Sequence, residues 1–466
     1  MDATTTAYNE TVALPLNASI AISETLALPP NVPRPVANAE RFQTVDLVRG
    51  FALLGILLMN IPGFGIDGSA FYNIIHGPHN TADYYTMAAI FSFFDGTMRG
   101  LFSMLFGAGM VLFTMNKKEL EGGATVAEYY YRRLLWLVVF GVINAYVLLW
   151  PGDILFYYGL FGMLLYPFRK AAPKWLIVIG LACFATGFFT QQLGYTEYRE
   201  KRLEYVKAIS AEKAHVKLTD KQKAAKAQWE EIEKNRKPDP ERVNRDVSKM
   251  RSGYGVMFSY FTERNGNMEA MVTYRDWPDM LGMMFIGMGL LALGFFSNKL
   301  STSTYAMTLL VGYGVGIPIG LIFFSKGIAV TDIGRYLDAY RVPHWALYDL
   351  RRVLLSVGHA SLLMLVFTSR IIPWLMKVLS NVGQMAFTNY LMQSIICTLI
   401  FYGYGLGYYN KLSFHQLYYI VGSVWILQMI YSSIWLRYYR FGPFEWLWRS
   451  LTYWKVQPMR IAAKGV

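Results

Sequence analysis

RFQTVDLVRGFALLGILLMNIPGFG, residues 41–65, is the stretch that decides the fold, because its charged start leads directly into a long apolar segment. An apolar run of about 20 residues can cross a bilayer as a helix. Asp46 and Arg49 stand three positions apart, so on a helix they share one face and can form an ion pair. Ionisable groups at membrane depth are costly and usually face a bundle interior or a watery cavity. Arg49 is therefore a candidate anion-binding residue, with an ordinary flank residue snorkelling to the headgroups as the alternative.

Similar apolar runs recur along the whole chain, in which 54% of the residues are apolar. This pattern is typical of a polytopic helical membrane protein, and we predict an all-α transmembrane bundle of about ten spans. The predicted spans cover residues 45–64, 86–115, 134–150, 154–168, 175–193, 280–296, 305–324, 347–368, 386–404 and 417–436. The second span is either one long helix or an interfacial helix followed by a membrane helix, because Asp95 and Arg99 interrupt its apolar run.

The net charge of +13 follows the predicted topology and does not indicate a nucleic-acid partner. Lys and Arg gather in the short loops on the side of the N-terminus, which by the positive-inside rule places both termini in the cytoplasm. We predict a disordered cytoplasmic tail over residues 1–40, a first transmembrane region over 41–193, an extracytoplasmic helical insert over 194–276, a second transmembrane region over 277–436 and a cytoplasmic interfacial tail over 437–466.

Polar side chains at membrane depth are the main candidates for a site. The sequence contains no P-loop, no GxGxxG after a strand, no HExxH and no CxxC, so no nucleotide, hydride or metal site is predicted. Asn60 and Asp153 lie near the outer ends of predicted spans, while Asn389 and Gln393, spaced i and i+4, share one helix face. Each alone is more often an interhelical hydrogen-bonding residue, but together they indicate a polar cavity within the bundle.

Two histidines lie in the predicted outer loop NIIHGPHNTADYY, residues 73–85. His76 and His79 stand shortly before Asp83. A histidine beside a carboxylate can act as a general base, because the carboxylate orients the ring and stabilises its charged form. The alternative is a polar loop without chemistry.

Five segments together resemble one family of bacterial membrane proteins. They are DLVRGFALLGILLMNI at 46–61, LFSMLFGAGM at 101–110, GDILFYYGL at 152–160, GQMAFTNYLMQSIICTLIFYGYGLG at 383–407 and RYYRFGPFEWLWRSLTYW at 437–454. On these segments the chain is identified as a member of the YeiB-like family, long labelled as of unknown function. The resemblance runs from about residue 41 to residue 457.

That family in turn is similar to the transmembrane acyltransferase superfamily, which includes acyltransferase-3 proteins and heparan-α-glucosaminide N-acetyltransferase. The resemblance implies transfer of an acyl group from cytoplasmic acyl-CoA, such as acetyl-CoA, to an acceptor across the membrane. Acyltransferase-3 proteins carry an Arg followed eleven positions later by a His, whereas here Arg49 is followed at that distance by Asn60. Asn60 cannot accept a proton at physiological pH. The glucosaminide relatives place an essential histidine in the first outer loop before an Ala-Asp pair, which makes His79, His76 and Asp83 the implied catalytic set.

The implied site therefore has three parts. Arg49, with its neighbour Asp46, and Arg449 of the basic tail would hold the phosphates of acyl-CoA, for which the planar guanidinium is suited. His79 or His76 would deprotonate the acceptor. The substrate or the developing oxyanion would meet the remaining polar residues, namely Asn60, Asn389, Gln393 and Asp153.

Two other function classes remain open on the sequence alone. A ten-span bundle with a polar interior also suits a transporter or flippase, although no inverted repeat is visible. A third reading is a non-catalytic scaffold whose outer insert binds a partner. The expected location is the bacterial inner membrane. Expected partners are membrane lipid and a small-molecule or glycan acceptor, with a homo-oligomer left open and no nucleic acid.

Overall fold

The computed structural model describes residues 43–114, 125–329 and 333–461, and helix accounts for 81% of these described residues. The first half comprises α2 (Gln43–Gly65), α3 (Ser69–His76), α4 (Ala82–Phe93), α5 (Thr97–Thr114), α6 (Val126–Val142), the π-helix η2 (Ile143–Val147), α7 (Leu155–Gly162), the 3-10 helix η3 (Met163–Phe168) and α8 (Pro173–Lys213). The rest comprises α9 (Asp220–Arg236), α10 (Pro240–Met250), α11 (Tyr254–Arg275), α12 (Trp277–Ala292), α13 (Thr302–Ala329), α14 (Ile333–Ala339), η4 (His344–Leu347), α15 (Tyr348–Ser369), α16 (Pro373–Gln384), α17 (Ala386–Phe401), α18 (Phe414–Tyr438) and α19 (Pro443–Tyr453).

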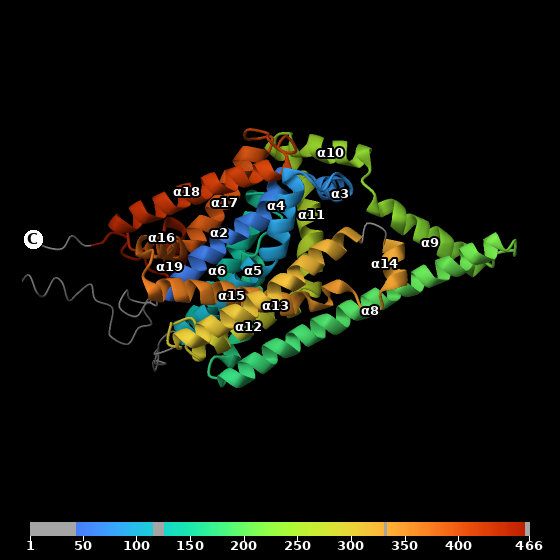
Figure 1. Cartoon of the computed structure of the whole chain (residues 1–466). Helices are drawn as coiled ribbons and strands as arrows, with labels where there is room; N and C mark the ends of the chain where they lie inside the picture. Colours follow the sequence, from blue (N-terminus) through green and yellow to red (C-terminus); the bar gives the residue numbers. More distant parts are fainter. Residues whose placement is uncertain (1–42, 115–124, 330–332, 462–466) are drawn as a thin grey trace, which may run out of the picture.

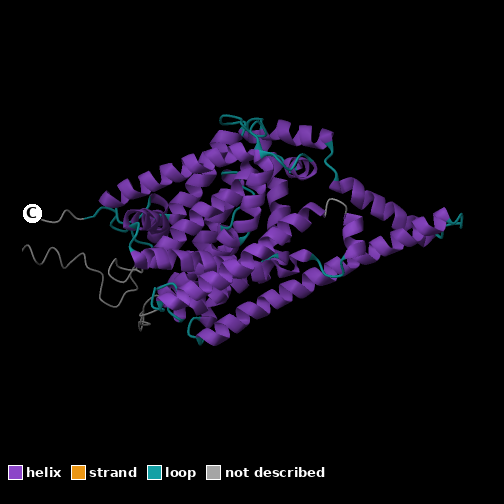
Figure 2. Cartoon of the chain, in the orientation of Figure 1, coloured by secondary structure: helices purple, strands orange, loops and turns teal. Residues whose placement is uncertain are grey.

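The described residues contain no strand, which confirms the predicted all-α class (Figure 2). Among them, six helical segments are long and apolar enough to cross a membrane, namely Gln43–Gly65, Ala82–Thr114, Pro173–Lys213, Thr302–Gly327, His344–Ser369 and Phe414–Tyr438. Three shorter apolar segments, Leu155–Phe168, Trp277–Ala292 and Ala386–Phe401, accompany them. The fold is that of a helical membrane protein, while the count of ten spans and the side of each terminus stay predictions. The tail predicted over residues 1–40 lies outside the described residues.

The second predicted span consists of two helices that are separated near Asp95. Helix α4 ends at Phe93 and α5 begins at Thr97, with Gly96 between them at φ +69°. Glycine adopts this left-handed backbone conformation without the steric penalty that a side chain would add. The backbone carbonyls at such a break lose their helical partners and need other donors.

Helix α8 shows that the fifth predicted span and the insert are continuous. It runs for 41 residues, about 60 Å at 1.5 Å per residue, with no helix end at the boundary predicted between residues 193 and 194. In Figure 1 it extends past the bundle and meets α9 at the end opposite the C-terminus. Trp229 of α9 is fully buried there in a small cluster with Tyr195 of α8 and Tyr336 of α14.

Helix α2 lies at the centre of the bundle, in contact with α5, α15, α16, α17 and α18 (Figure 1). The α5–α12 pair next to it is unusually close. A β-carbon placed on Gly107 of α5 would collide with the carbonyl oxygen of Met284, and one placed on Gly287 of α12 would collide with the carbonyl oxygen of Met104. Glycines at these points let the two backbones touch, as small residues do in membrane helix pairs.

Candidate functional site

A cavity of about 180 Å³ opens among α2, α5, α6, α7, α16, α17 and α19. We call the end of the bundle that carries α19 the α19 end, and the opposite end the α3 end. Three arginines, Arg49, Arg133 and Arg449, line the cavity together with Glu445. Apolar and aromatic side chains make up most of the remaining wall, among them Phe102, Leu105, Phe106, Met110, Phe113, Leu134, Leu137, Leu155 and Phe387. The cavity therefore combines a basic rim with an apolar interior.

The guanidinium groups of the rim are held by neighbouring side chains. Arg49 donates to Asp46 at 2.7 Å, which is the i, i+3 pair expected from the sequence. The guanidinium carbon of Arg133 lies 4.1 Å from the centroid of the Trp448 ring, and that of Arg449 lies 4.4 Å from the centroid of the Phe441 ring. Stacking uses the face of a guanidinium and leaves the donors along its edge directed sideways. Arg133 is thus preorganised to meet an anion in the cavity.

Glu445 joins α19 to the first turn of α17. Its Oε1 accepts the backbone N–H groups of Phe387 at 2.7 Å and Thr388 at 3.0 Å, and its Oε2 accepts the Thr388 hydroxyl. The first N–H groups of a helix have no intrahelical acceptor, and a carboxylate there also interacts favourably with the helix dipole. Glu445 therefore fixes the mouth of the cavity by capping α17.

The buried Glu445 gives a pH-dependent prediction. Burial raises the pKa of the Glu445 carboxyl above its ordinary value, although its hydrogen bonds act in the opposite direction. Because the folded protein then holds this proton more tightly than the unfolded chain, the free energy of unfolding falls as pH rises from the ordinary pKa through the raised one. Within this window we expect the wild type to gain stability on acidification and Glu445→Gln, which cannot titrate, to lack that gain. Thermal unfolding of both proteins in detergent at several pH values measures the difference; parallel curves would contradict the prediction.

Tyr390 and Tyr158 also line the cavity. The Tyr390 hydroxyl accepts the N–H of Ile154 at 3.1 Å and lies 3.5 Å from Oδ1 of Asp153. Asp153 also accepts the side-chain amide of Asn144 at 2.8 Å and the N–H of Phe156 at 2.9 Å. A buried carboxylate thus stands directly behind one phenol of the cavity wall.

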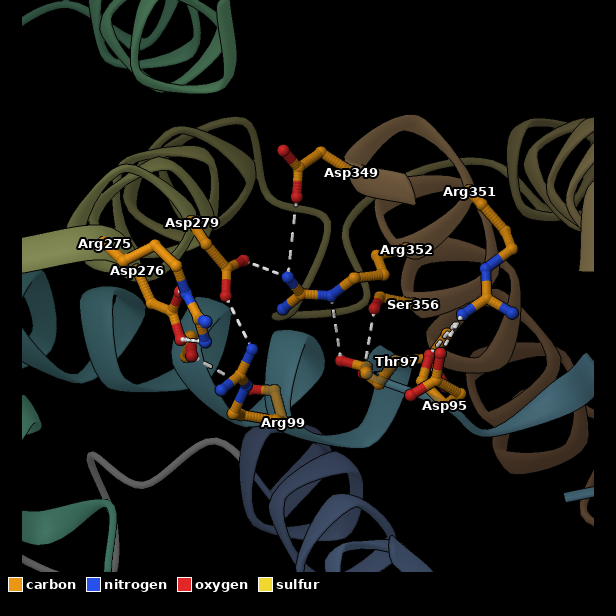
Figure 3. Close-up of polar contacts among 12 residues, drawn as sticks. Asp95, Thr97, Arg99, Arg275, Asp276, Asp279, Asp349, Arg351, Arg352 and Ser356 are labelled. Carbon is orange, nitrogen blue, oxygen red and sulfur yellow. Dashed lines mark hydrogen bonds and ion pairs between the residues drawn. The ribbon is translucent and has the colours of Figure 1, made fainter. Parts of the chain in front are cut away.

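A second polar cluster fills the break between α4 and α5 (Figure 3). Arg351 donates to the carbonyl oxygens of Phe91 at 2.9 Å and Asp95 at 2.7 Å, while Arg352 donates to that of Gly96 at 3.1 Å. The hydroxyl of Ser356 donates to the carbonyl oxygen of Thr97 at 2.9 Å. Arg351 of α15 therefore supplies donors to the carbonyl oxygens of Phe91 and Asp95 at the break, whereas the carbonyl oxygen of Gly96 also accepts the N–H of Gly100 at 2.9 Å.

Carboxylates balance the arginines of this cluster. Asp279, at the start of α12, pairs with Arg352 and, at 2.7 Å, with Arg99, while Asp95 lies 2.9 Å from Arg351. In Figure 3 Arg352 stands between Asp279 and Asp349, with 3.6 Å separating it from Asp349. We call these charged groups of α5, α12 and α15 and the α4–α5 break the ion-pair cluster. The sequence did not predict this cluster as a site, because Asp279 at the start of α12 is far in sequence from both Arg99 and Arg352.

The outer-loop residues are arranged differently from the prediction. Oδ1 of Asp83 accepts both the backbone N–H of His415 at 2.8 Å and its ring Nδ1–H at 2.7 Å. His76 and His79 instead bond backbone carbonyl oxygens four residues earlier, at 2.7 Å and 3.0 Å. Asp83 pairs with His415 because the first turn of α18, whose N–H groups lack helical acceptors, lies against the start of α4. The expected pairing of Asp83 with His79 or His76 is corrected accordingly.

The predicted amides lie away from the cavity. Asn389 donates to the Val382 carbonyl at 3.2 Å and to Ser432 at 2.9 Å, and Gln393 donates to Gln428 at 3.1 Å. Both act as interhelical hydrogen-bonding residues between α17 and its neighbours. Asn60 is half-buried on α2 and does not line the cavity.

Among the predicted residues, Arg49 and Arg449 meet in one cavity, whereas Arg133 and Tyr390 were missed. In the sequence, Arg133 falls in one of the predicted short loops, whose Lys and Arg residues indicate only the topology. A helical pattern could have found it, since Tyr130, Leu134 and Leu137 mark the buried face of α6 and Arg133 falls on that face.

A bundle of apolar helices with a basic cavity and a buried ion-pair cluster defines a polytopic helical membrane protein. Residues 290–455 match the family model described as "Protein of unknown function (DUF418)". The chain is 31% identical to "Uncharacterized protein YxaH" of Bacillus subtilis (strain 168) over 449 residues, covering 91% of this chain and 98% of that protein. It is 30% identical to "Uncharacterized protein YeiB" of Escherichia coli (strain K12) over 423 residues, covering 89% of this chain and 96% of that protein. The chain therefore belongs to the YeiB-like family, as its sequence segments indicate. No solved structure matches it.

Proposed function

We propose that this protein is a membrane-bound acyltransferase that takes an acyl group from cytoplasmic acyl-CoA and passes it to an extracytoplasmic or membrane acceptor such as a glycan. The observation that carries the proposal is the cavity itself, in which three arginines, Arg49, Arg133 and Arg449, and one acidic residue, Glu445, stand beside a mostly apolar and aromatic wall. Arginine binds phosphate at two points, and a stacked guanidinium loses little freedom on binding. The cavity mouth would face the cytoplasm of a bacterial inner membrane.

The length of the cavity wall suits a ligand with an anionic head and an extended arm. The centroid of the Phe113 ring lies 5.4 Å from the guanidinium carbon of Arg133. Phe102, which also lines the cavity, precedes Phe113 by eleven residues on α5, which corresponds to about 16 Å along the helix axis. The phosphates would meet the rim, and the acyl-bearing arm would lie along α5 towards Tyr158 and Tyr390.

The cavity wall also offers a proton acceptor. In the proposed step, an acceptor hydroxyl or amine attacks the thioester carbonyl carbon, the bond from that carbon to sulfur breaks, and the CoA thiolate leaves. The acceptor's proton would pass through the Tyr390 hydroxyl to Asp153. His79, His76 and the Asp83–His415 pair lie at the α3 end, so they form a second set of bases, closer to an acceptor that arrives from outside.

Thermal stabilisation of the purified protein by CoA and acetyl-CoA tests the proposal. We expect saturable stabilisation in the wild type and about tenfold to a hundredfold weaker binding in Arg133→Ala, since a charged hydrogen bond to phosphate contributes roughly 1.5–3 kcal/mol. Arg132→Ala is the matched control, because Arg132 is the adjacent residue but lines a different surface groove with Trp454. No stabilisation at millimolar ligand, or equal loss in both variants, would overturn the proposal.

A transporter is the second candidate, and one specific observation favours it. The apolar segment Ala82–Thr114 is discontinuous, because α4 and α5 are separated at Gly96, and this break borders the ion-pair cluster. Discontinuous helices frame the substrate site in many secondary transporters. Flux of a small molecule into proteoliposomes without acyl-CoA, combined with no CoA binding, would favour this function.

A further inference from the structure

A third polar cluster lies where α11 crosses the π-helix η2, and it is distinct from the arginine rim. The side-chain amide of Asn265 donates to the carbonyl oxygen of Ala145 at 2.6 Å, and the Tyr146 hydroxyl donates to Oε2 of Glu269 at 3.0 Å. Asn265 and Glu269 are spaced i and i+4, so they share one face of α11. Single π-helical turns within α-helices occur frequently at functional sites.

Three oxygen atoms of this cluster are buried without a donor. Among the described residues, Oδ1 of Asn144, Oδ1 of Asn265 and Oε1 of Glu269 have no hydrogen-bond partner. Asn144 is 0% exposed and Asn265 is 1% exposed. The orientation of each amide is fixed, because the nitrogen of Asn144 donates to Asp153 and that of Asn265 donates to Ala145. A flipped amide would set oxygen against oxygen, so both Oδ1 atoms must act as acceptors.

The negative charge of the cluster also indicates that it lacks a positively charged partner. Asp153 and Glu269 are both acidic, and no ion pair joins either of them to a basic side chain within the described ranges. Tyr146 and Tyr157 are the other titratable groups facing them, with Asp276 further away. Buried carboxylates and amide oxygens are costly when they lack donors or positive charge. A cation would neutralise the two carboxylates and accept all of these oxygens as ligands.

We infer that the oxygens of Asn144, Asn265 and Glu269, backed by Asp153, form a binding site for a compact cation, either an inorganic ion such as Na⁺ or an ammonium group. Hard cations prefer carboxylate and amide oxygens over nitrogen or sulfur ligands. Amide and carboxylate oxygens, with no thiolate or imidazole among them, are ligands of the hard type that such a cation prefers. This inference does not depend on acyl transfer.

Cation-dependent thermal unfolding of the full chain in detergent tests the site. NaCl, KCl and methylammonium chloride are titrated against N-methylglucamine chloride at constant ionic strength. We expect a saturable rise in the apparent Tm with one of the compact cations, and about tenfold weaker half-saturation in Glu269→Gln, which removes one charge while keeping the shape. Glu263→Gln on the exposed side of α11 is the matched control and should titrate with cation as the wild type does.

The outcomes distinguish an inorganic ion from an organic amine, and they distinguish the cation site from the proposed CoA site. A shift with Na⁺ or K⁺ alone identifies an inorganic ion, and a shift with methylammonium alone identifies an organic amine. If Glu269→Gln does not fold, Glu269→Asp keeps the charge with a shorter reach and should still bind the cation, more weakly. No saturable shift over N-methylglucamine, or unchanged half-saturation in the Glu269 variants, would overturn the site. Arg133→Ala, which tests CoA binding, should retain the full cation effect.

Discussion

Replacing Arg352 with alanine is expected to destabilise the protein by about 3–5 kcal/mol, the range for removing one partner of a buried ion pair. Arg352 is 1% exposed and bonds Asp279, Asp349 and the carbonyl oxygen of Gly96. Its loss leaves Asp279 with Arg99 as the remaining arginine partner and removes the side-chain donor of the Gly96 carbonyl, which keeps the N–H of Gly100. Thermal unfolding in detergent should show a large fall in the apparent Tm.

Two variants separate the buried cluster from general effects of losing a charge. Arg352→Lys keeps one charge beside Asp279 but lacks the planar fork that also reaches Gly96, so an intermediate loss is expected. Arg245→Ala removes an exposed ion pair with Glu241, with side chains 63% and 88% exposed, and should change stability by no more than about 0.5 kcal/mol. Equal losses in Arg352→Ala and Arg245→Ala would show that the cluster does not hold the break.

The second large effect is expected from Gly287→Ala at the crossing of α12 and α5. The added β-carbon would collide with the carbonyl oxygen of Met104, and a backbone atom cannot rotate away as a side chain can. Overpacking of this kind costs about 1–3 kcal/mol, and we expect the upper end because both helices must separate. The effect opposes helix propensity, since alanine is otherwise the better helix former by about 1 kcal/mol.

Gly314→Ala supplies the matched comparison for Gly287→Ala. No heavy atom lies within 4 Å of the position where its β-carbon would stand. The same substitution should therefore leave stability unchanged or raise it slightly. Unfolding midpoints of the two variants test the pair directly, and a loss at Gly314 as large as at Gly287 would mean that propensity or the detergent, and not the helix crossing, decides the result.

Features set by neighbouring residues could be predicted from the sequence. The apolar runs predicted the all-α membrane fold, because a segment buried in lipid must satisfy its own backbone hydrogen-bonding groups, as a helix does. The spacing of Asp46 and Arg49 gave their ion pair, since three positions make most of one helical turn. Family membership also followed from contiguous segments. Each of these depends only on residues that are close together along the chain.

Partners distant in sequence were decided by the tertiary structure. Asp83 contacts His415, 332 positions away, and not the nearby His79, because α4 lies beside the start of α18. Arg133 faces the cavity while Arg132 faces another groove, a choice set by how α6 rotates against α5 and α19. The sequence by itself therefore determined the helices, their apolar character and the local pairs. Only the packing of helices determined which charges meet, because a side chain's partner depends on elements that the chain brings together from far apart.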